Sequence, residues 1–170
     1  MKEEPLYFNL QPFSLVTTSL LLSLPLAGSL NLGTPVAAEN TNINDSEEAS
    51  YFWQKNNQTE AEQHLQQGIR QFRRGQFQDA LTSYQQALVI YRELKDKLGE
   101  AATLNKIGEV YLNLGEYPKA LESLQQALTI QQAIEDSTGQ AATLNYLGVV
   151  YHRLGDYFQA LDLHQQALDI

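Results

Sequence analysis

The chain contains an internal repeat with a period of 40 residues. Residues 99–130 reappear as residues 139–170, with 19 of 32 positions unchanged. An earlier, more diverged copy keeps the same period, because Gly75, Gly115 and Gly155 share one phase. A repeat of this length is one supersecondary unit that cannot bury its hydrophobic face alone, so successive copies must stack against one another. The sequence therefore predicts a solenoid, a fold whose main functional feature is an extended surface.

Each copy has the pattern of a helical hairpin. In the middle copy, apolar side chains recur every three or four residues, which places them on one face of a helix from about Gly99 to Leu114. Gly115 is expected to end this helix, because glycine tolerates the positive φ of a helix C-terminus. Tyr117-Pro118 starts a second helix, which we expect to run to about Ile134. The break between the copies is expected at a glycine, as at Leu98-Gly99.

The positions with small, aromatic and leucine side chains resemble the tetratricopeptide repeat. In the middle copy they are Leu104, Gly108, Tyr111, Gly115, Tyr117, Ala120, Leu124 and Ala127. Across all three copies, the expected structural repeat positions are Gly68, Gly75, Ala80, Ala87, Gly108, Tyr111, Gly115, Ala120, Ala127, Gly148, Tyr151, Gly155, Ala160 and Ala167. The unit is longer than the usual one of about 34 residues. It is similar to the long repeats of kinesin light chains and of bacterial multi-repeat proteins with a caspase-like effector domain.

The resemblance implies a fold class and a domain organisation. The fold is expected to be all-α, a right-handed solenoid of about three antiparallel helical hairpins over residues 59–170. The repeats are expected near residues 61–97, 101–137 and 141–170.

Residues 1–38 have the features of a secretory signal peptide. The apolar run Leu15–Leu26 is too short to cross a hydrocarbon core about 30 Å thick, and Val36-Ala37-Ala38 places small residues before a cleavage site at Glu39. We therefore expect an exported protein, either periplasmic or secreted. The alternative is an uncleaved membrane anchor from Phe13 to Leu32, which would be the only attachment to a membrane.

Residues 39–58 are expected to be a disordered linker. They are rich in Asn, Ser and Glu, and such a segment cannot bury enough apolar area to order itself. Tyr51-Phe52-Trp53 is the exception, and it includes the only tryptophan of the chain. It has two interpretations: a segment that covers the exposed first helix of the solenoid, or a tethered ligand that folds back into the binding groove.

Composition argues against several classes of function. The formal net charge is −9, so no nucleic-acid partner is expected. The chain has no cysteine, which removes thiolate catalysis and cysteine zinc sites. His64, His152 and His164 lack the spacing of metal ligands, and the first and last occupy positions that normally hold a packing side chain. We therefore expect no enzyme activity, no cofactor and no metal site.

The resemblance also implies a binding surface. In tetratricopeptide arrays the first helices of successive hairpins line a concave groove, which binds a protein or an extended peptide. The expected groove residues are Asn105, Glu109, Leu112, Asn145, Val149 and His152. Asn105 and Asn145 share one phase, and an amide side chain can either pair with a peptide backbone or form an inter-helix hydrogen bond that fixes the stacking. The sequence leaves both roles open.

The C-terminal repeat presents one end of the solenoid. Leu161 and Leu168, with the neighbouring Ala160 and Ala167, are expected to form the face that would receive the first helix of another repeat. An apolar face without a polar cap favours association. The alternatives to a binding scaffold are therefore a fragment of a longer multi-repeat regulator whose effector domain is absent, and a structural subunit that self-associates through its C-terminal repeat.

Overall fold

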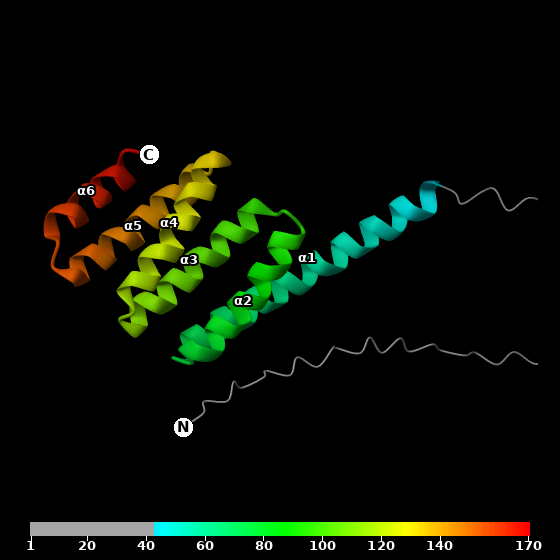
Figure 1. The fold of residues 1–170 in the computed structure, drawn as a ribbon, viewed down its shortest axis with the longest axis horizontal. Coiled ribbons are helices and arrows are strands. Elements are labelled where there is room, and N and C mark those ends of the chain that lie inside the picture. The colour runs from blue at the N-terminus through cyan, green and yellow to red at the C-terminus, as the bar shows by residue number, and fades with distance from the viewer. Residues whose placement is uncertain (1–42) are drawn as a thin grey trace, which may run out of the picture. The chain divides into compact units, whose positions relative to one another are not determined.

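The computed structural model describes the fold of residues 43–170 and the side chains of residues 46–170. Within this part of the chain there are six α-helices and no strand. The helices are α1 (Ile43–Arg73), α2 (Phe77–Glu93), α3 (Lys97–Leu114), α4 (Tyr117–Ala133), α5 (Ser137–Leu154) and α6 (Tyr157–Leu168). They pair as α1–α2, α3–α4 and α5–α6, and the three hairpins follow one another in a single array (Figure 1). The prediction of an all-α solenoid of about three hairpins is confirmed.

The N-terminal predictions fall mostly outside this part of the chain. The signal peptide over residues 1–38, the cleavage at Glu39 and the alternative anchor from Phe13 to Leu32 lie outside the described residues. Among α1 to α6, no helix combines the length and the apolar character that a membrane span requires.

A glycine in the left-handed conformation forms the turn inside each hairpin. Gly75, Gly115 and Gly155 have φ of 74°, 75° and 84°, a region that other residues rarely adopt. The backbone N–H of Gly115 donates to the carbonyl oxygen of Leu112, so the last carbonyls of α3 keep hydrogen-bond partners. The predicted end of this helix at Gly115 is confirmed.

The turns between hairpins differ from the sequence prediction. α2 ends at Glu93, Lys95 takes a φ of 58°, and the side chain of Asp96 caps α3 by accepting a hydrogen bond from the backbone N–H of Gly99. The chain therefore breaks before Leu98-Gly99, and Gly99 lies inside the first turn of α3. A Cβ atom at Gly99 would lie 2.4 Å from the ring of Tyr91. This glycine is required for close packing of two helices rather than for ending one.

α1 is the second difference. It has 31 residues, and residues 43–58, predicted as part of a disordered linker, are its N-terminal half. The prediction assumed that this segment must bury apolar area of its own to become ordered. A helix that is already nucleated in a packed hairpin gains one hydrogen bond for each residue added, and this segment contains no proline or glycine to stop it.

The aromatic triplet lies on this N-terminal half of α1. Tyr51, Phe52 and Trp53 are 65%, 68% and 52% exposed. Consecutive residues of a helix point about 100° apart, so no single surface can cover all three. Neither interpretation holds, because the triplet is part of α1 itself and lies outside the groove between the first helices, although Tyr51 lines a pocket between α1 and the turn after α2.

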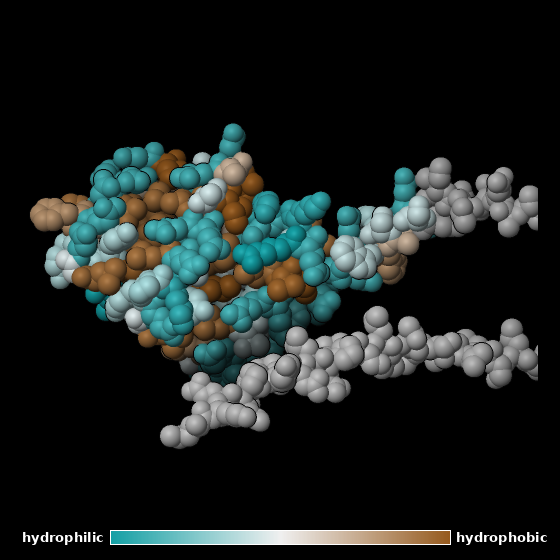
Figure 2. All heavy atoms as spheres, in the orientation of Figure 1, coloured by the Kyte–Doolittle hydropathy of each residue, from teal (hydrophilic) through white to brown (hydrophobic). Residues whose placement is uncertain are grey.

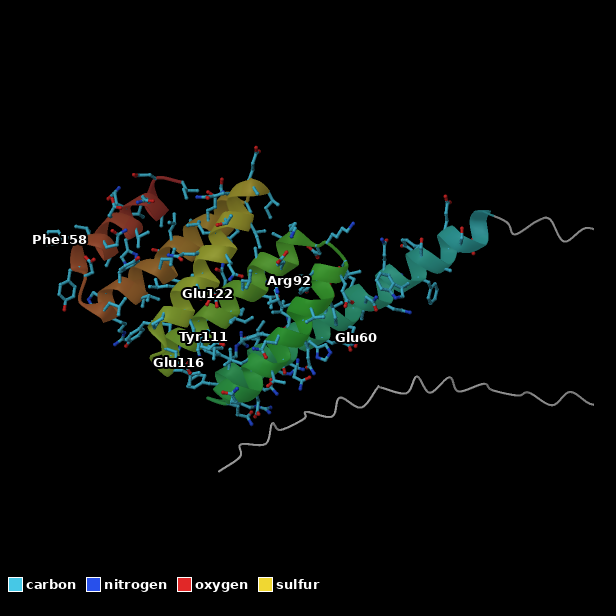
Figure 3. The ribbon with its side chains drawn as sticks, in the orientation of Figure 1. Glu60, Arg92, Tyr111, Glu116, Glu122 and Phe158 are labelled. Atoms are coloured by element: carbon cyan, nitrogen blue, oxygen red, sulfur yellow. The ribbon has the colours of Figure 1, made fainter. Side chains whose placement is uncertain are left out.

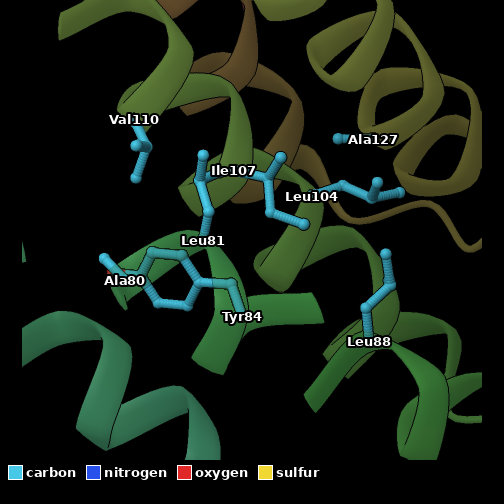
Figure 4. Close-up of a cluster of buried hydrophobic side chains, with 8 residues drawn as sticks. All are labelled: Ala80, Leu81, Tyr84, Leu88, Leu104, Ile107, Val110 and Ala127. Atoms are coloured by element: carbon cyan, nitrogen blue, oxygen red, sulfur yellow. The ribbon is translucent and has the colours of Figure 1, made fainter. Parts of the chain in front are cut away.

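The core runs along the seams between helices. One cluster joins the first two hairpins and consists of Ala80, Leu81, Tyr84, Leu88, Leu104, Ile107, Val110 and Ala127 (Figure 4). A second joins the last two and consists of Ala120, Leu124, Leu144, Leu147, Val150 and Leu163. Small residues allow the close approach, since Ala80, Ala87, Ala120 and Ala127 are fully buried and a Cβ atom at Gly108 would lie 2.6 Å from the side chain of Leu124. The predicted repeat positions thus lie at the helix contacts and the turns.

Candidate groove face

The second and third hairpins curve with their first helices, α3 and α5, on the inner side. α3 contacts α5 directly, whereas α2 and α4 share no comparable contact, and neither do α4 and α6. Helices that lie closer together mark the inside of a curve. We call the inward side of α3 and α5 the groove face, and its residues are Ala102, Lys106, Glu109, Ala142, Asn145, Tyr146, Val149 and Arg153.

Two adjoining pockets lie on the groove face. One has a volume of about 310 Å³ and is lined by Ala142, Asn145, Tyr146 and Val149. The other has a volume of about 370 Å³ and lies where α3 ends, lined by Leu112, Asn113, Leu114, Gly115, Tyr117, Val149 and Arg153. Val149 belongs to both and is 36% exposed, so its side chain stands at the junction of the two. Together they form one recess, whose first part has mainly apolar walls and whose second part is mainly polar and includes the Arg153 guanidinium group.

A polar cluster connects α3 to α5 beside this recess. Lys106 Nζ lies 2.9 Å from Glu109 Oε2. Burial lowers the pKa of the Lys106 ammonium, but the hydrogen bond and the charge of Glu109 outweigh it, so the pKa is raised overall. Burial and the nearby Glu109 carboxylate raise the pKa of the Tyr146 phenol. At neutral pH, the cluster therefore holds a compensated ion pair and a neutral phenol.

Asn105 is buried in the seam between the second and third hairpins. It is 8% exposed, and its Oδ1 lies 2.8 Å from Thr143 Oγ1. The same hydroxyl lies 2.6 Å from Oε1 of Gln131, which is 1% exposed. Of the two roles left open by the sequence, the structure assigns Asn105 the inter-helix hydrogen bond. Its prediction as a groove residue is corrected, because its side chain points at α5 rather than at solvent.

Asn145 has the same phase and a different environment. It is exposed, lines the first pocket, and its Oδ1 lies 2.8 Å from His164 Nδ1. No first helix follows α5 among the described residues, so nothing there takes the place that α5 takes over Asn105. Its amide is therefore accessible from the groove face.

The other predicted groove residues are spread over a wider area. Glu109 and Val149 lie on the groove face with Asn145. Leu112 is half-buried against the second core cluster and borders the second pocket. His152 is exposed near the end of α5, where its ring packs edge-on against Tyr157 with centroids 5.2 Å apart.

Three further groove-face residues were not in the predicted set. Lys106 and Tyr146 are equivalent residues that directly follow the two asparagines, and Arg153 follows His152. Helical phase alone could have identified them, because each is about one turn from a predicted residue on the same helix.

His64 and His164 occupy half-buried packing sites. The ring of His164 lies over Gly148, where a Cβ atom would approach its Cε1 to 2.7 Å, just as Leu124 lies over Gly108. His64 is half-buried on α1, with Nε2 3.8 Å from Oε1 of Glu60. Within the part of the chain that the structure describes, no group of three His, Cys, Asp or Glu side chains could hold a metal ion.

A family model for the tetratricopeptide repeat matches residues 71–133 and 100–170. The chain belongs to the tetratricopeptide repeat family. Among solved structures it is similar to the tetratricopeptide repeat domain of Arabidopsis FLU, with 21% identity and a TM-score of 0.63 over 66% of this chain and 95% of that one. No curated protein shows significant similarity to the chain. Tetratricopeptide arrays are in general scaffolds for protein–protein interaction and are typically not enzymes.

Proposed function

We propose that the protein is a binding scaffold whose groove face takes an extended segment of a partner protein. The observation that carries the proposal is the recess around Val149, because it lies on the inner side of the curve and the apolar walls of its first pocket are open to solvent. A pocket of this size accommodates one apolar side chain of a bound peptide. The accessible amide of Asn145 offers the peptide backbone both a donor and an acceptor.

The electrostatics of the groove face favour a particular peptide chemistry. Lys106 and Glu109 neutralise each other, whereas Arg153 takes part in none of the ion pairs found in residues 46–170. A carboxylate beside the apolar anchor would face the Arg153 guanidinium. The proposed ligand is therefore an extended peptide with an apolar residue next to an acidic one.

A larger pocket elsewhere fits this function less well. It has a volume of about 470 Å³ and lies between α1 and the turn after α2. Its two sides are joined by a hydrogen bond from Gln58 Nε2 to Asp96 Oδ2, and its polar and apolar surfaces are about equal. Unlike the mainly apolar pocket beside Asn145 and Val149, it is not lined by any residue of the groove face.

The test is selection from a random peptide library displayed on phage, followed by calorimetry with the selected peptides. We expect the selected sequences to share an apolar residue beside Asp or Glu. Val149→Asp should reduce their affinity at least tenfold, because it places a charge in the apolar recess. Val89→Asp is the matched control, since Val89 is 55% exposed on α2, away from the groove face, and should leave affinity unchanged. Selected peptides that bind Val149→Asp as tightly as the parent chain would overturn the proposal.

A further inference from the structure

A pocket lies on the outer side of the array, at the seam between the first and second hairpins. It has a volume of about 320 Å³, with α2 and α4 as its walls and α3 as its floor. The floor consists of Leu104, Ile107 and Tyr111, which lie on the side of α3 opposite to the groove face. We call this site the outer pocket. It is built entirely by the first two hairpins.

A serine leaves the space for the outer pocket. Ser123 lines its α4 wall and is 8% exposed, and its hydroxyl donates back to the carbonyl oxygen of Lys119 at 2.9 Å. The equivalent residue of the third hairpin is Leu163, which is 7% exposed and belongs to the second core cluster. Tyr151, the equivalent of Tyr111, packs against the same cluster. The repeat therefore accepts a leucine at this position, and the second hairpin carries a smaller side chain there.

One end of the outer pocket carries an excess of positive charge. The side chain of Arg92 makes one hydrogen bond within residues 46–170, from Nε to Glu100 Oε1 at 2.9 Å. Its two terminal amino groups are therefore available as donors. Lys97 Nζ lies 2.7 Å from the other oxygen of Glu100. Because one carboxylate is shared by two cations, a further carboxylate would be favourable beside Arg92.

The other end of the outer pocket also has a cation. Lys119 Nζ lies 5.4 Å from the centroid of the Tyr111 ring and forms an ion pair with Glu116. The two charged side chains are 59% and 41% exposed, so water screens their attraction. An ammonium group has three donors, which leaves Lys119 able to bind a second carboxylate.

The rest of the rim is suited to a peptide backbone. Gln85 and Gln126 are exposed amides on opposite walls, and each offers a donor and an acceptor. Glu122 between them can accept a backbone N–H. Figure 3 shows Arg92, Tyr111 and Glu122 on the three helices that line the outer pocket. On the same face, Figure 2 shows hydrophobic side chains between hydrophilic ones in the middle of the array.

We propose that the outer pocket binds an extended acidic segment of a partner protein, which places one apolar side chain in the pocket and a carboxylate near each end. The two cations lie beside Glu100 and Tyr111, which are eleven residues apart on α3, or about 16 Å. An extended chain covers this distance in about five residues. The proposed ligand therefore has an apolar residue between two acidic residues about five positions apart. The outer pocket and the groove face lie on opposite sides of α3, so this site does not depend on peptide binding at the groove face.

Selection from a random peptide library displayed on phage tests the site, with the full chain carrying Val149→Asp as the bait to suppress binding at the groove face. We expect the selected peptides to share the acidic–apolar–acidic pattern. Adding Ser123→Leu should reduce their affinity at least tenfold in calorimetry, because it fills the outer pocket with the side chain found at Leu163. Gln125→Leu is the matched control, since this exposed residue of α4 does not line the pocket, and it should leave affinity unchanged.

A second variant tests the charges without filling the pocket. Arg92→Gln plus Lys119→Gln copies the residues at the equivalent positions of the next repeat, which are Gln132 and Gln159. We expect at least a tenfold loss of affinity at low salt and a weaker dependence of affinity on salt. Circular dichroism should show the same helix content for every variant, and if Ser123→Leu loses helix content, the glutamine variant alone decides. The proposal is overturned if no peptide is selected, if the selected peptides lack acidic residues, or if they bind the glutamine variant or a folded Ser123→Leu variant as tightly as the bait.

Discussion

Replacing Thr143 by Val tests whether the buried polar contacts hold the second and third hairpins together. The substitution keeps the shape of the side chain and removes one hydroxyl. That hydroxyl lies 2.8 Å from Asn105 Oδ1 and 2.6 Å from Gln131 Oε1, and both amides are buried. The carbonyl oxygen of Gly139 lies 2.9 Å from the same hydroxyl, and a hydroxyl has only one proton to donate, so Thr143→Val would remove the one donor that these oxygens share. A buried polar group that loses its partner costs about 1–3 kcal/mol, so we expect the free energy of unfolding to fall by about 1–3 kcal/mol.

The preceding repeat supplies a matched control. Thr103 occupies the equivalent position and is equally buried, but its hydroxyl donates only to the carbonyl oxygen of Gly99, one turn earlier in the same helix. The neighbours that correspond to the two amides are Leu65 and Tyr91, which make this seam apolar. Thr103→Val leaves no side-chain oxygen unpaired, and we expect it to cost less than about 1 kcal/mol.

Urea unfolding followed by circular dichroism measures the two changes on the same scale. If the m-value is unchanged, the shift of the midpoint gives the loss of stability directly. If Thr143→Val and Thr103→Val lower the free energy of unfolding equally, the reasoning is refuted, because the loss would then come from removing any buried threonine hydroxyl and not from the contacts between hairpins. A rescue variant adds a second criterion. Adding Asn105→Leu and Gln131→Tyr to Thr143→Val reproduces the apolar seam between the first and second hairpins, and it should recover most of the stability that Thr143→Val loses.

Two further predictions concern a charge and a glycine. Burial opposes ionisation of Glu100, but its contacts with Arg92 and Lys97 outweigh burial and hold its pKa below the ordinary 4.5. A carboxyl group whose pKa is depressed by folding stabilises the folded state at pH values above its ordinary pKa, and this stabilisation is lost as the pH falls through the pKa of the folded state. In urea titrations, Glu100→Gln should therefore lower the free energy of unfolding by about 1 kcal/mol at pH 7 and leave it unchanged at pH 2. Gly108→Ala should lower the free energy of unfolding by about 1–3 kcal/mol, because its Cβ atom would lie 2.6 Å from Leu124. In a Leu124→Ala background this clash is absent, and the same substitution should raise the free energy of unfolding because alanine favours a helix more than glycine does. A loss in both backgrounds would contradict the packing argument.

The 40-residue repeat alone predicts most of the fold. Glycine, alanine and leucine recur at the same positions of each copy, so the number of helices, the order of the hairpins and the turn at Gly115 can be predicted from the helix and turn preferences of these residues. The length of α1 did not follow, because residues 43–58 are polar and only their continuity with a packed helix orders them. The role of Gly99 did not follow either. Its sequence neighbours indicate a break, whereas the decisive contact comes from Tyr91 on another helix.

The candidate site shows why phase alone cannot assign function in a solenoid. Asn105 and Asn145 are identical residues at equivalent positions, yet one is buried against α5 and the other borders an open pocket. Leu81 and Leu161 differ in the same way. In each pair the chemistry of the side chain is constant, and the presence or absence of a following hairpin decides whether it stabilises a seam or remains accessible. The surface that we propose for peptide binding therefore depends on exposure as well as on phase, because Asn145 borders an open pocket where its equivalent Asn105 is buried.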